Sequence, residues 1–347
     1  MDMLSLPEQS KLYPPTRFMG SKKKLLPSIF EVINDLEFDT AIDAFSGSGV
    51  VSYLFKTLGK KVISNDHMHM STVFATALIE NNDVCLSEQQ VERLLSPASN
   101  NDRFVQETFQ GLYFSDSDCR TIDDIRFNMR YLRKPEARAI AMTSLIRACM
   151  KRRPRGIFTY TGDRYDDGRN DLQMSIAEHF VEAVKQVNSA VFDNGKANEA
   201  RNSDALSLRA RKRSLIYLDP PYYTPKSDNQ YVRRYHFVEG LARDWNGVEI
   251  QEHTQTKKFK SYDTPFSTRN GALSAFEQIF RKFNQSIILV SYSSNALPCL
   301  EEIVDTMSKF KDDVSVIPVD HRYSFGNQGH RIGDNRNAVK EYLFLGQ

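Results

Sequence analysis

The four consecutive residues Asp219-Pro220-Pro221-Tyr222 are the part of this chain best suited to chemistry. They follow the apolar run 215–218, which predicts a buried strand, so they form a proline-stiffened turn where that strand ends. The turn offers a carboxylate, a carbonyl and an aromatic ring within a few residues. Such a set can bind a planar ring that carries an amine, because the oxygens accept from the amine and the aromatic face covers the ring. The competing interpretation is a strand-ending turn whose tyrosine packs in the core.

A second candidate site is the segment Phe45-Ser46-Gly47-Ser48-Gly49, which follows a predicted strand at 40–45. Glycines in this position let the backbone approach a ligand closely at the carboxyl edge of a sheet. Asp66 ends the next predicted strand, 61–66, and its carboxylate could accept two hydrogen bonds from a ribose diol. This element alone is a weak signal, since its spacing is not GxGxxG. It leaves a dinucleotide-dependent enzyme open, and it leaves Asp66 open as an ordinary acid at a strand end.

The elements around these residues predict a doubly wound α/β fold. Helical spacing of apolar residues over 25–36 and 50–58 brackets the strand at 40–45, which gives the order strand, glycine-rich turn, helix, strand, acid. Later apolar runs predict strands at 189–192, 215–218, 286–292, 314–319 and 340–345.

Residues 81–172 break this rhythm, because they are more polar, helix-rich and dotted with aromatic residues. We interpret them as an insertion with its own small core. Ser175 and Glu178 have the spacing of a capping box, which predicts that a helix begins there. The expected organisation is therefore a catalytic domain of residues 1–80 plus 173–347, with 81–172 inserted into it.

The stretch 224–270 is long, charged and poor in periodicity. A segment of that length inside a compact domain is usually a lid, a binding loop or a disordered region. Because it begins directly after the Asp219 turn, we expect a long loop that faces the substrate.

The composition of the chain excludes several classes of protein but does not by itself assign a function. The 347 residues suit one catalytic domain with a substantial insertion. No apolar run approaches the ~18 residues of a membrane helix, and the N-terminus lacks the apolar region of a signal peptide, so we expect a cytoplasmic protein without membrane contact. The four cysteines are widely spaced and the seven histidines lack the spacing of metal ligands, so no metal is expected. A net charge of +2 says nothing about partners.

Three motifs occur in the order seen in the Dam-like (D12 class, α-group) DNA adenine-N6 methyltransferases: Arg17 to Lys22, Asp43 to Gly49, and Asp219 to Tyr222. The chain resembles that family over nearly its whole length, although the insertion is recognisable only by position. The resemblance implies a Rossmann-like class I sheet that uses S-adenosylmethionine, with 81–172 as a target-recognition domain. It implies methyl transfer to N6 of a flipped-out adenine at a specific site in double-stranded DNA. The expected setting is a restriction-modification system with a separately acting cognate endonuclease.

The cofactor residues follow from matching the family motifs position by position. The Lys22 cation suits the methionine carboxylate, Asp66 would hold the ribose, and Phe18 stands where family members often have Tyr or Trp. Residues 202–205 are placed like the segment that borders the cofactor adenine. The positions that the resemblance assigns to the cofactor are Phe18, Gly20, Lys22, Asp43, Phe45, Ser46, Gly47, Gly49, Asp66, Ser203, Asp204 and Asp219.

The resemblance makes Asp219, Pro220, Pro221 and Tyr222 the catalytic residues. The adenine N6 lone pair is delocalised into the ring, so this amine is a poor nucleophile. Hydrogen bonds from N6 to the Asp219 carboxylate and the Pro220 carbonyl would localise the lone pair, and the Asp219 charge would stabilise the positive charge that develops. Tyr222 would stack on the base. Stacking contributes ~1–3 kcal/mol and so offsets part of the free energy of flipping the base out, which is on the order of a few kcal/mol.

Local basic clusters are the expected DNA contacts, because such clusters can neutralise phosphates and arginine matches guanine edges. For any single cluster, a solvated helix end is the more common explanation. The candidates for phosphate or base contact are Arg152, Arg153, Arg155, Arg233 and Arg234.

Two alternatives stay open beside the adenine enzyme. Methylation of cytosine N4 uses the same chemistry on another exocyclic amine, although those enzymes more often carry Ser at the position of Asp219. An inactive DNA-binding or specificity subunit could keep the fold, although intact Lys22, Gly47 and Asp66 argue against such decay.

Overall fold

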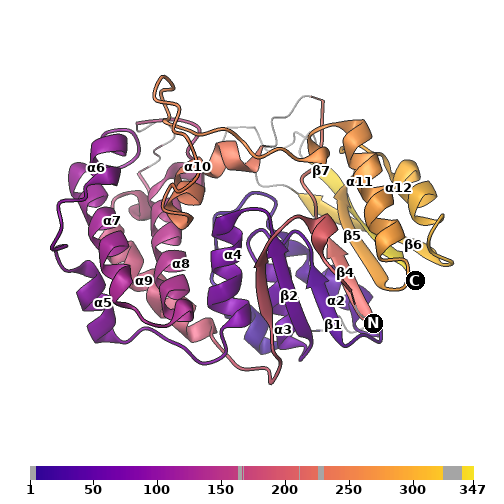
Figure 1. Cartoon of the computed structure of the whole chain (residues 1–347). Helices are drawn as coiled ribbons and strands as arrows, with labels where there is room; N and C mark the ends of the chain where they lie inside the picture. The colour runs from indigo at the N-terminus through magenta and orange to yellow at the C-terminus, as the bar shows by residue number, and fades with distance from the viewer. Residues whose placement is uncertain (1–4, 163–165, 167, 211, 226–229, 323–337) are drawn as a thin grey trace.

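A seven-stranded, mostly parallel sheet forms the centre of the computed structural model, which describes residues 5–162, 166, 168–210, 212–225, 230–322 and 338–347 (Figure 1). The strand order is β3-β2-β1-β4-β5-β7-β6, and β7 is antiparallel to both of its neighbours. This confirms the expected α/β methyltransferase-like sheet. The strands are β1 (Thr40–Asp43), β2 (Lys61–Asp66), β3 (Glu199–Asn202), β4 (Ser214–Leu218), β5 (Ile287–Ser293), β6 (Val314–Arg322) and β7 (Ala338–Gly346).

The central strands are recognisable in the sequence because both of their faces are buried. Every residue of β4 is buried. Leu215 and Tyr217 belong to the hydrophobic cluster on one face of the sheet, and Ile216 and Leu218 belong to the cluster on the other. A strand covered on both faces reads as a continuous apolar run, which is why the prediction of a strand at 215–218 is confirmed.

Helices cover both faces of the sheet (Figure 1). The short helix α1 (Glu8–Lys11) lies near the N-terminus. The first cluster includes residues of α2 (Leu26–Ile33), α3 (Val50–Thr57) and α4 (His69–Ala75), and the second includes residues of α11 (Arg269–Lys282) and α12 (Leu300–Met307). The predicted strand, turn, helix, strand order over β1, α3 and β2 is confirmed. No helix among the described residues is long and apolar enough to cross a membrane.

A second group of helices packs beside α4, at the end of the sheet near β2 and β3 (Figure 1). Ser175 and Glu178 form the predicted capping box at the start of α9. The expectation of a separate small core is wrong, because Phe109, Ile122 and Leu145 belong to the same buried cluster as the first face of the sheet. The helices are α5 (Glu88–Leu95), α6 (Phe104–Phe109), α7 (Asp116–Asn128), α8 (Pro135–Arg152) and α9 (Ile176–Ala190).

The strand predicted at 189–192 is wrong. Helix α9 continues to Ala190, and the edge strand of the sheet is β3, seven or more residues further on. Strand β3 contains Glu199 and Arg201, and Glu199 pairs with Lys61 at 2.8 Å. An edge strand that is only partly buried carries charged residues, so it lacks the apolar run on which the prediction relied.

The stretch 224–270 is not the aperiodic loop that we expected, because it contains helix α10 (Tyr231–Ala242). Eight of the twelve residues in this helix are buried. A helix buried on most sides has no polar face, so the sequence shows no 3.6-residue alternation. The remainder, residues 243–268, crosses from α10 toward α11 (Figure 1), and we call this segment the strap. It contains an isolated β-bridge between Ile250 and Phe259. Residues 226–229 lie outside the described part of the chain.

Candidate active site

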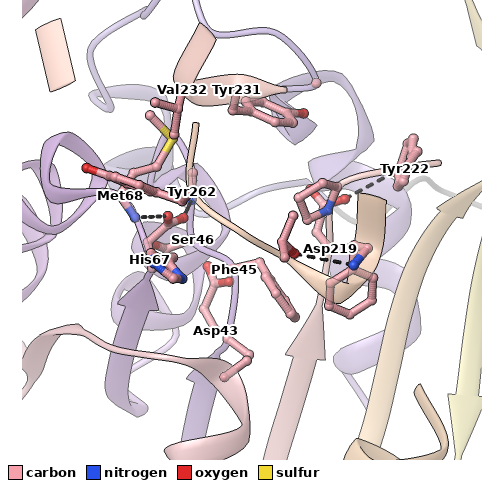
Figure 2. A pocket seen from close by; sticks show the side chains of 18 of the residues that line it. Asp43, Phe45, Ser46, His67, Met68, Asp219, Tyr222, Tyr231, Val232 and Tyr262 are labelled. Carbon is pink, nitrogen blue, oxygen red and sulfur yellow. Dashed lines mark hydrogen bonds between the residues drawn. The ribbon is translucent and has the colours of Figure 1, made fainter. Parts of the chain in front are cut away.

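A cavity of about 260 Å³ opens at the carboxyl ends of β1, β2 and β4. Figure 2 shows Asp219 and Tyr222 on one side of this cavity, and His67, Met68 and Tyr262 on the other. The sequence-predicted residues that line it are Phe18, Gly20, Lys22, Asp43, Phe45, Ser46, Gly47, Asp66, Ser203, Asp204, Asp219, Pro221 and Tyr222. Parallel strands end at one edge, and for this reason motifs far apart in the chain meet here.

The glycine-rich turn requires glycine at two positions. Gly47 and Gly49 have φ angles of 50° and 80°, in the left-handed region that side chains disfavour. A Cβ atom on Gly47 would lie 3.1 Å from the Phe18 ring, and one on Gly49 would lie 2.7 Å from the hydroxyl of Tyr13. Gly49 is not among the lining residues; it ends the turn and begins α3. Its role is therefore to shape the turn.

Asp66 binds the glycine-rich turn directly. Its Oδ2 accepts a hydrogen bond from the Gly47 amide and its Oδ1 accepts one from the Met68 amide, both at 2.8 Å. Burial raises the pKa of Asp66 to about 6, against the effect of these hydrogen bonds. A carboxylate has about four acceptor positions, so at most two remain for the hydroxyls of a ligand.

The Asp219–Tyr222 turn is joined to the N-terminal motif by Lys22, which is 5% exposed. The Lys22 ammonium lies 2.8 Å from Asp219 Oδ1 and donates to the Tyr222 hydroxyl at 2.7 Å and to the Gly20 carbonyl at 3.4 Å. An ammonium has three N–H donors, so all three are in use. A ligand carboxylate that binds Lys22 must therefore displace one of these partners.

Sequence reasoning missed a second carboxylate at this turn. Glu341 of β7 is fully buried, and its carboxylate lies 3.3 Å from the Tyr222 hydroxyl, which also lies 3.1 Å from Asp219 Oδ1. Burial raises the pKa of Asp219 to about 6; Lys22 opposes this rise and Glu341 adds to it. Pro220 is buried, and Pro221 lines the cavity.

Asp43 lies at the floor of the cavity, below Phe45 in Figure 2. Ser52 donates to its Oδ2 at 2.7 Å, and its buried Oδ1 has no hydrogen-bond partner among the described residues. Burial raises the pKa of Asp43 to about 7, and the nearby carboxylates of Asp219 and Asp66 add to this rise. A buried carboxyl at a cavity floor with one oxygen that lacks a hydrogen-bond partner is a candidate ligand group.

The remaining predicted cofactor residues lie around the rim. The Phe18 ring stacks on Tyr235 of α10 with centroids 5.2 Å apart. Ser203 donates to Asn65 at 2.7 Å. Asp204 Oδ1 accepts from the Leu206 amide at 2.8 Å, so this side chain caps a short turn as well as lining the cavity.

Four further residues line the wall of the cavity, and of these Met68 and Tyr262 had no signal in the sequence that we recognised. His67 and Tyr262 stack with their ring centroids 5.1 Å apart, Met68 lies on the same side of the cavity, and Tyr231 lies above it in the view of Figure 2. The position of His67 directly after Asp66 was the available clue. Among the described residues no group of three or more His, Cys, Asp or Glu side chains could hold a metal ion.

The five candidate DNA-binding arginines differ in placement. Arg153 is 3% exposed and donates to the carbonyls of Tyr160 and Gly162, so we do not retain it as a DNA contact. Arg152 bonds to the Leu172 carbonyl and lies 3.5 Å from Asp118. The remaining three are Arg155, with a φ of 61°, and Arg233 and Arg234 on α10, of which Arg233 is exposed.

Comparisons with known proteins agree with this geometry. A model of the D12 class N6 adenine-specific DNA methyltransferases matches residues 18–295. The chain is similar to the type II methyltransferase M2.HphI of Haemophilus parahaemolyticus, with 28% identity over 350 residues, 96% of this chain and 97% of that protein. It is 21% identical over 347 residues to M.NlaIII of Neisseria lactamica, covering 94% and 98% of the two chains. It is 27% identical over 328 residues to the modification methylase StsI of Streptococcus sanguinis, but spans only 47% of that protein.

Proposed function

The chain belongs to the family of D12 class N6 adenine-specific DNA methyltransferases, and from this premise we propose that it methylates N6 of a flipped-out adenine at a specific site in double-stranded DNA, with S-adenosylmethionine as the methyl donor. The observation that carries the proposal is the shared cavity. Asp66, suited to a ribose, and Asp219, suited to an amine, line the same space at the sheet edge. A methyl donor and an amine acceptor can therefore meet between them.

The lining fits the proposed cofactor. Asp66 keeps acceptor positions for a diol, Asp43 has an unpartnered oxygen, and the glycine at position 47 lets the backbone approach a ligand. Lys22 supplies the cation for a carboxylate once it releases Asp219 or Tyr222. When bound, the cofactor supplies an electrophilic methyl group on a sulfonium.

The residues of this chain supply acceptors for the amine and a face for the base. In the proposed reaction Asp219 and the Pro220 carbonyl accept hydrogen bonds from the two N6 hydrogens. The Asp219 charge stabilises the positive charge that develops on N6 in the transition state. Tyr222 stacks on the base in one of two ways. Either its hydroxyl leaves Lys22 and Glu341 and the ring moves, or the base enters beside the ring in its present position. Exchange of one Lys22 contact upon cofactor binding would release either Asp219 or Tyr222 for the base.

We further propose residues 81–172 as the target-recognition domain and 1–80 plus 173–347 as the catalytic domain. The helices α5 to α8 lie to one side of the sheet (Figure 1), and α10 joins the two parts, with Tyr231 at the cavity and Phe237 in the shared core. The exposed Arg233 lies on the same helix. DNA bound along α10 would thus have its flipped-out adenine at the cavity and its phosphate backbone at Arg233.

The relatives named as type II methyltransferases support a role in a restriction-modification system beside a separately acting endonuclease. Cytosine N4 methylation is the second candidate. The family model is adenine-specific, and cytosine-N4 enzymes more often carry Ser at the position of Asp219, so adenine is favoured.

The proposal is tested by incubating the protein with mixed-sequence duplex DNA and S-adenosylmethionine labelled in the methyl group. After digestion to nucleosides, we expect the label in N6-methyl-2′-deoxyadenosine and none in N4-methyl-2′-deoxycytidine. Sequencing of the product with modified-base detection gives the recognition site. Label confined to cytosine would replace the proposed base, and no label from a protein that binds the cofactor would refute the activity.

The rate should depend on pH through Asp219. This carboxyl has a pKa raised to about 6, so it is ionised above that pH and gains a proton as the pH falls through it. The protonated form loses the charge that stabilises the transition state, so kcat/KM for DNA at saturating cofactor should fall roughly tenfold per pH unit below about 6. A pH–rate profile measured between about pH 5 and 9, a range that spans the pKa of about 6 for Asp219, checks this.

The variant Glu341→Gln assigns the titration to Asp219. The Glu341 charge raises the pKa of Asp219 but is not among the causes of the shifts at Asp43 and Asp66. The acid limb of the profile should therefore move to lower pH in this variant. A limb that stays in place would show that another group controls the rate.

A further inference from the structure

A fully buried carboxylate on α10, Glu239, lies outside the three family motifs, in the stretch 224–270 that we expected to face the substrate. We propose that Glu239 is a positioning residue for the cofactor: it holds the wall of the cavity formed by His67, Met68 and Tyr262 in the shape that binds S-adenosylmethionine. The inference rests on the proposed function and adds a residue to it. It makes α10 a structural part of the cofactor site.

Glu239 ties two segments of the wall together through hydrogen bonds. Its Oε1 accepts from the His69 amide and its Oε2 from the Met70 amide, both at 2.9 Å, which fixes the chain directly after Asp66, His67 and Met68. The Tyr262 hydroxyl donates to Oε1 at 2.6 Å. One carboxylate thus fixes both the corner between β2 and α4 and the strap that crosses above it.

The Tyr262 ring has little freedom as a result. Its hydroxyl is held by Glu239 and receives a hydrogen bond from Arg243 at 2.9 Å, and its face stacks on His67. Figure 2 shows Tyr262, His67 and Met68 gathered on the side of the cavity opposite Asp219. Both rings line the cavity, so a shift of Tyr262 changes the surface that a ligand meets.

The charge on Glu239 is maintained although the side chain is buried. Burial alone would raise its pKa, but the hydrogen bonds from His69, Met70 and Tyr262 outweigh that effect and hold the pKa below its usual value. Arg243 reaches Glu239 through the Tyr262 hydroxyl. His69 Nδ1 lies 3.2 Å from Oε1. A buried carboxylate that relies on these partners keeps them in place, because losing any one leaves charge unsatisfied.

The decisive variant is Tyr262→Phe, which keeps the ring and removes only the hydroxyl that Glu239 and Arg243 hold. Its matched control is Tyr113→Phe, because the Tyr113 hydroxyl also makes internal hydrogen bonds, lying 2.6 Å from the Thr256 carbonyl and 3.1 Å from the Phe158 carbonyl, but Tyr113 does not line the cavity. The full chain is titrated with S-adenosylmethionine by calorimetry without DNA, and Tm is measured for each variant.

We expect Tyr262→Phe to weaken cofactor binding roughly tenfold, and Glu239→Gln to weaken it at least as much, because the amide cannot accept all the hydrogen bonds that the carboxylate accepts. Tyr113→Phe should bind the cofactor as the unmodified protein does, even where its Tm falls equally. In turnover assays the loss should appear in KM for the cofactor, with kcat retained at saturation.

Unchanged cofactor affinity in both Tyr262→Phe and Glu239→Gln would overturn the inference and leave Glu239 with a role in stability alone. Equal loss of affinity in Tyr113→Phe would do the same. If the unmodified protein itself binds no S-adenosylmethionine, the proposed function fails instead, so the two failures are distinguishable.

Discussion

Replacing Asp219 with alanine should lower the rate of methyl transfer by roughly 10³-fold, the effect typical of removing a fixed group that stabilises transition-state charge. The affinity for S-adenosylmethionine should be retained. In the structure Asp219 occupies one donor of Lys22, so its removal frees that donor for the cofactor carboxylate. Single-turnover rates with labelled cofactor and calorimetric titration of the cofactor measure the two quantities separately.

Asp219→Asn is the matched variant, because the amide keeps one oxygen to accept from the base but carries no charge. Its rate should lie between that of the unmodified protein and that of Asp219→Ala. Turnover that survives in Asp219→Ala would show that the carboxylate does not orient the amine. A large loss of cofactor affinity in the same variant would show that the ion pair with Lys22 organises the cofactor site rather than competing with it.

Replacing Asp66 with alanine should weaken S-adenosylmethionine binding by roughly 100-fold or more, since a hydrogen bond to a charged group contributes about 1.5–3 kcal/mol and the ribose offers two. The loss also leaves the Gly47 and Met68 amides without their acceptor, so the glycine-rich turn loses its tie to β2. Equilibrium titration of the cofactor in the absence of DNA gives the affinity.

Asp204→Ala is the control for Asp66→Ala. Asp204 lines the same cavity and caps a turn through the Leu206 amide, whereas Asp66 holds the glycine-rich turn through the Gly47 amide. We expect a loss of affinity well below that of Asp66→Ala. Equal losses would move the ribose assignment toward Asp204, and unchanged affinity in Asp66→Ala would remove it from Asp66.

The central strands and the two motifs at their ends could be predicted because their signals are local. Strand β4 is an apolar run that ends at Asp219, and β1 ends at the glycine-rich turn. Strand β3 and helix α10 were missed for opposite reasons. The first is a partly exposed edge whose charges hide it, and the second is buried on most of its sides and lacks a polar face.

The sequence by itself determined which chemistry this protein carries: a carboxylate, two prolines and an aromatic ring after one strand, and glycines and an acid around two others. Residue types and short spacings suffice for that, because each motif acts through its own turn. Its family membership followed from the same motifs and is confirmed by the match over residues 18–295.

Only the tertiary structure decided how these groups interact. Lys22 meets Asp219, Glu341 approaches Tyr222, and Glu239 holds Tyr262 against His67. Hydrogen bonds and ion pairs depend on distances of about 3 Å in space, and no spacing along the chain encodes which distant side chains will come that close. The sheet brings the strand ends to one edge, and the buried carboxylates on β7 and α10 reach the site from segments that carry no motif.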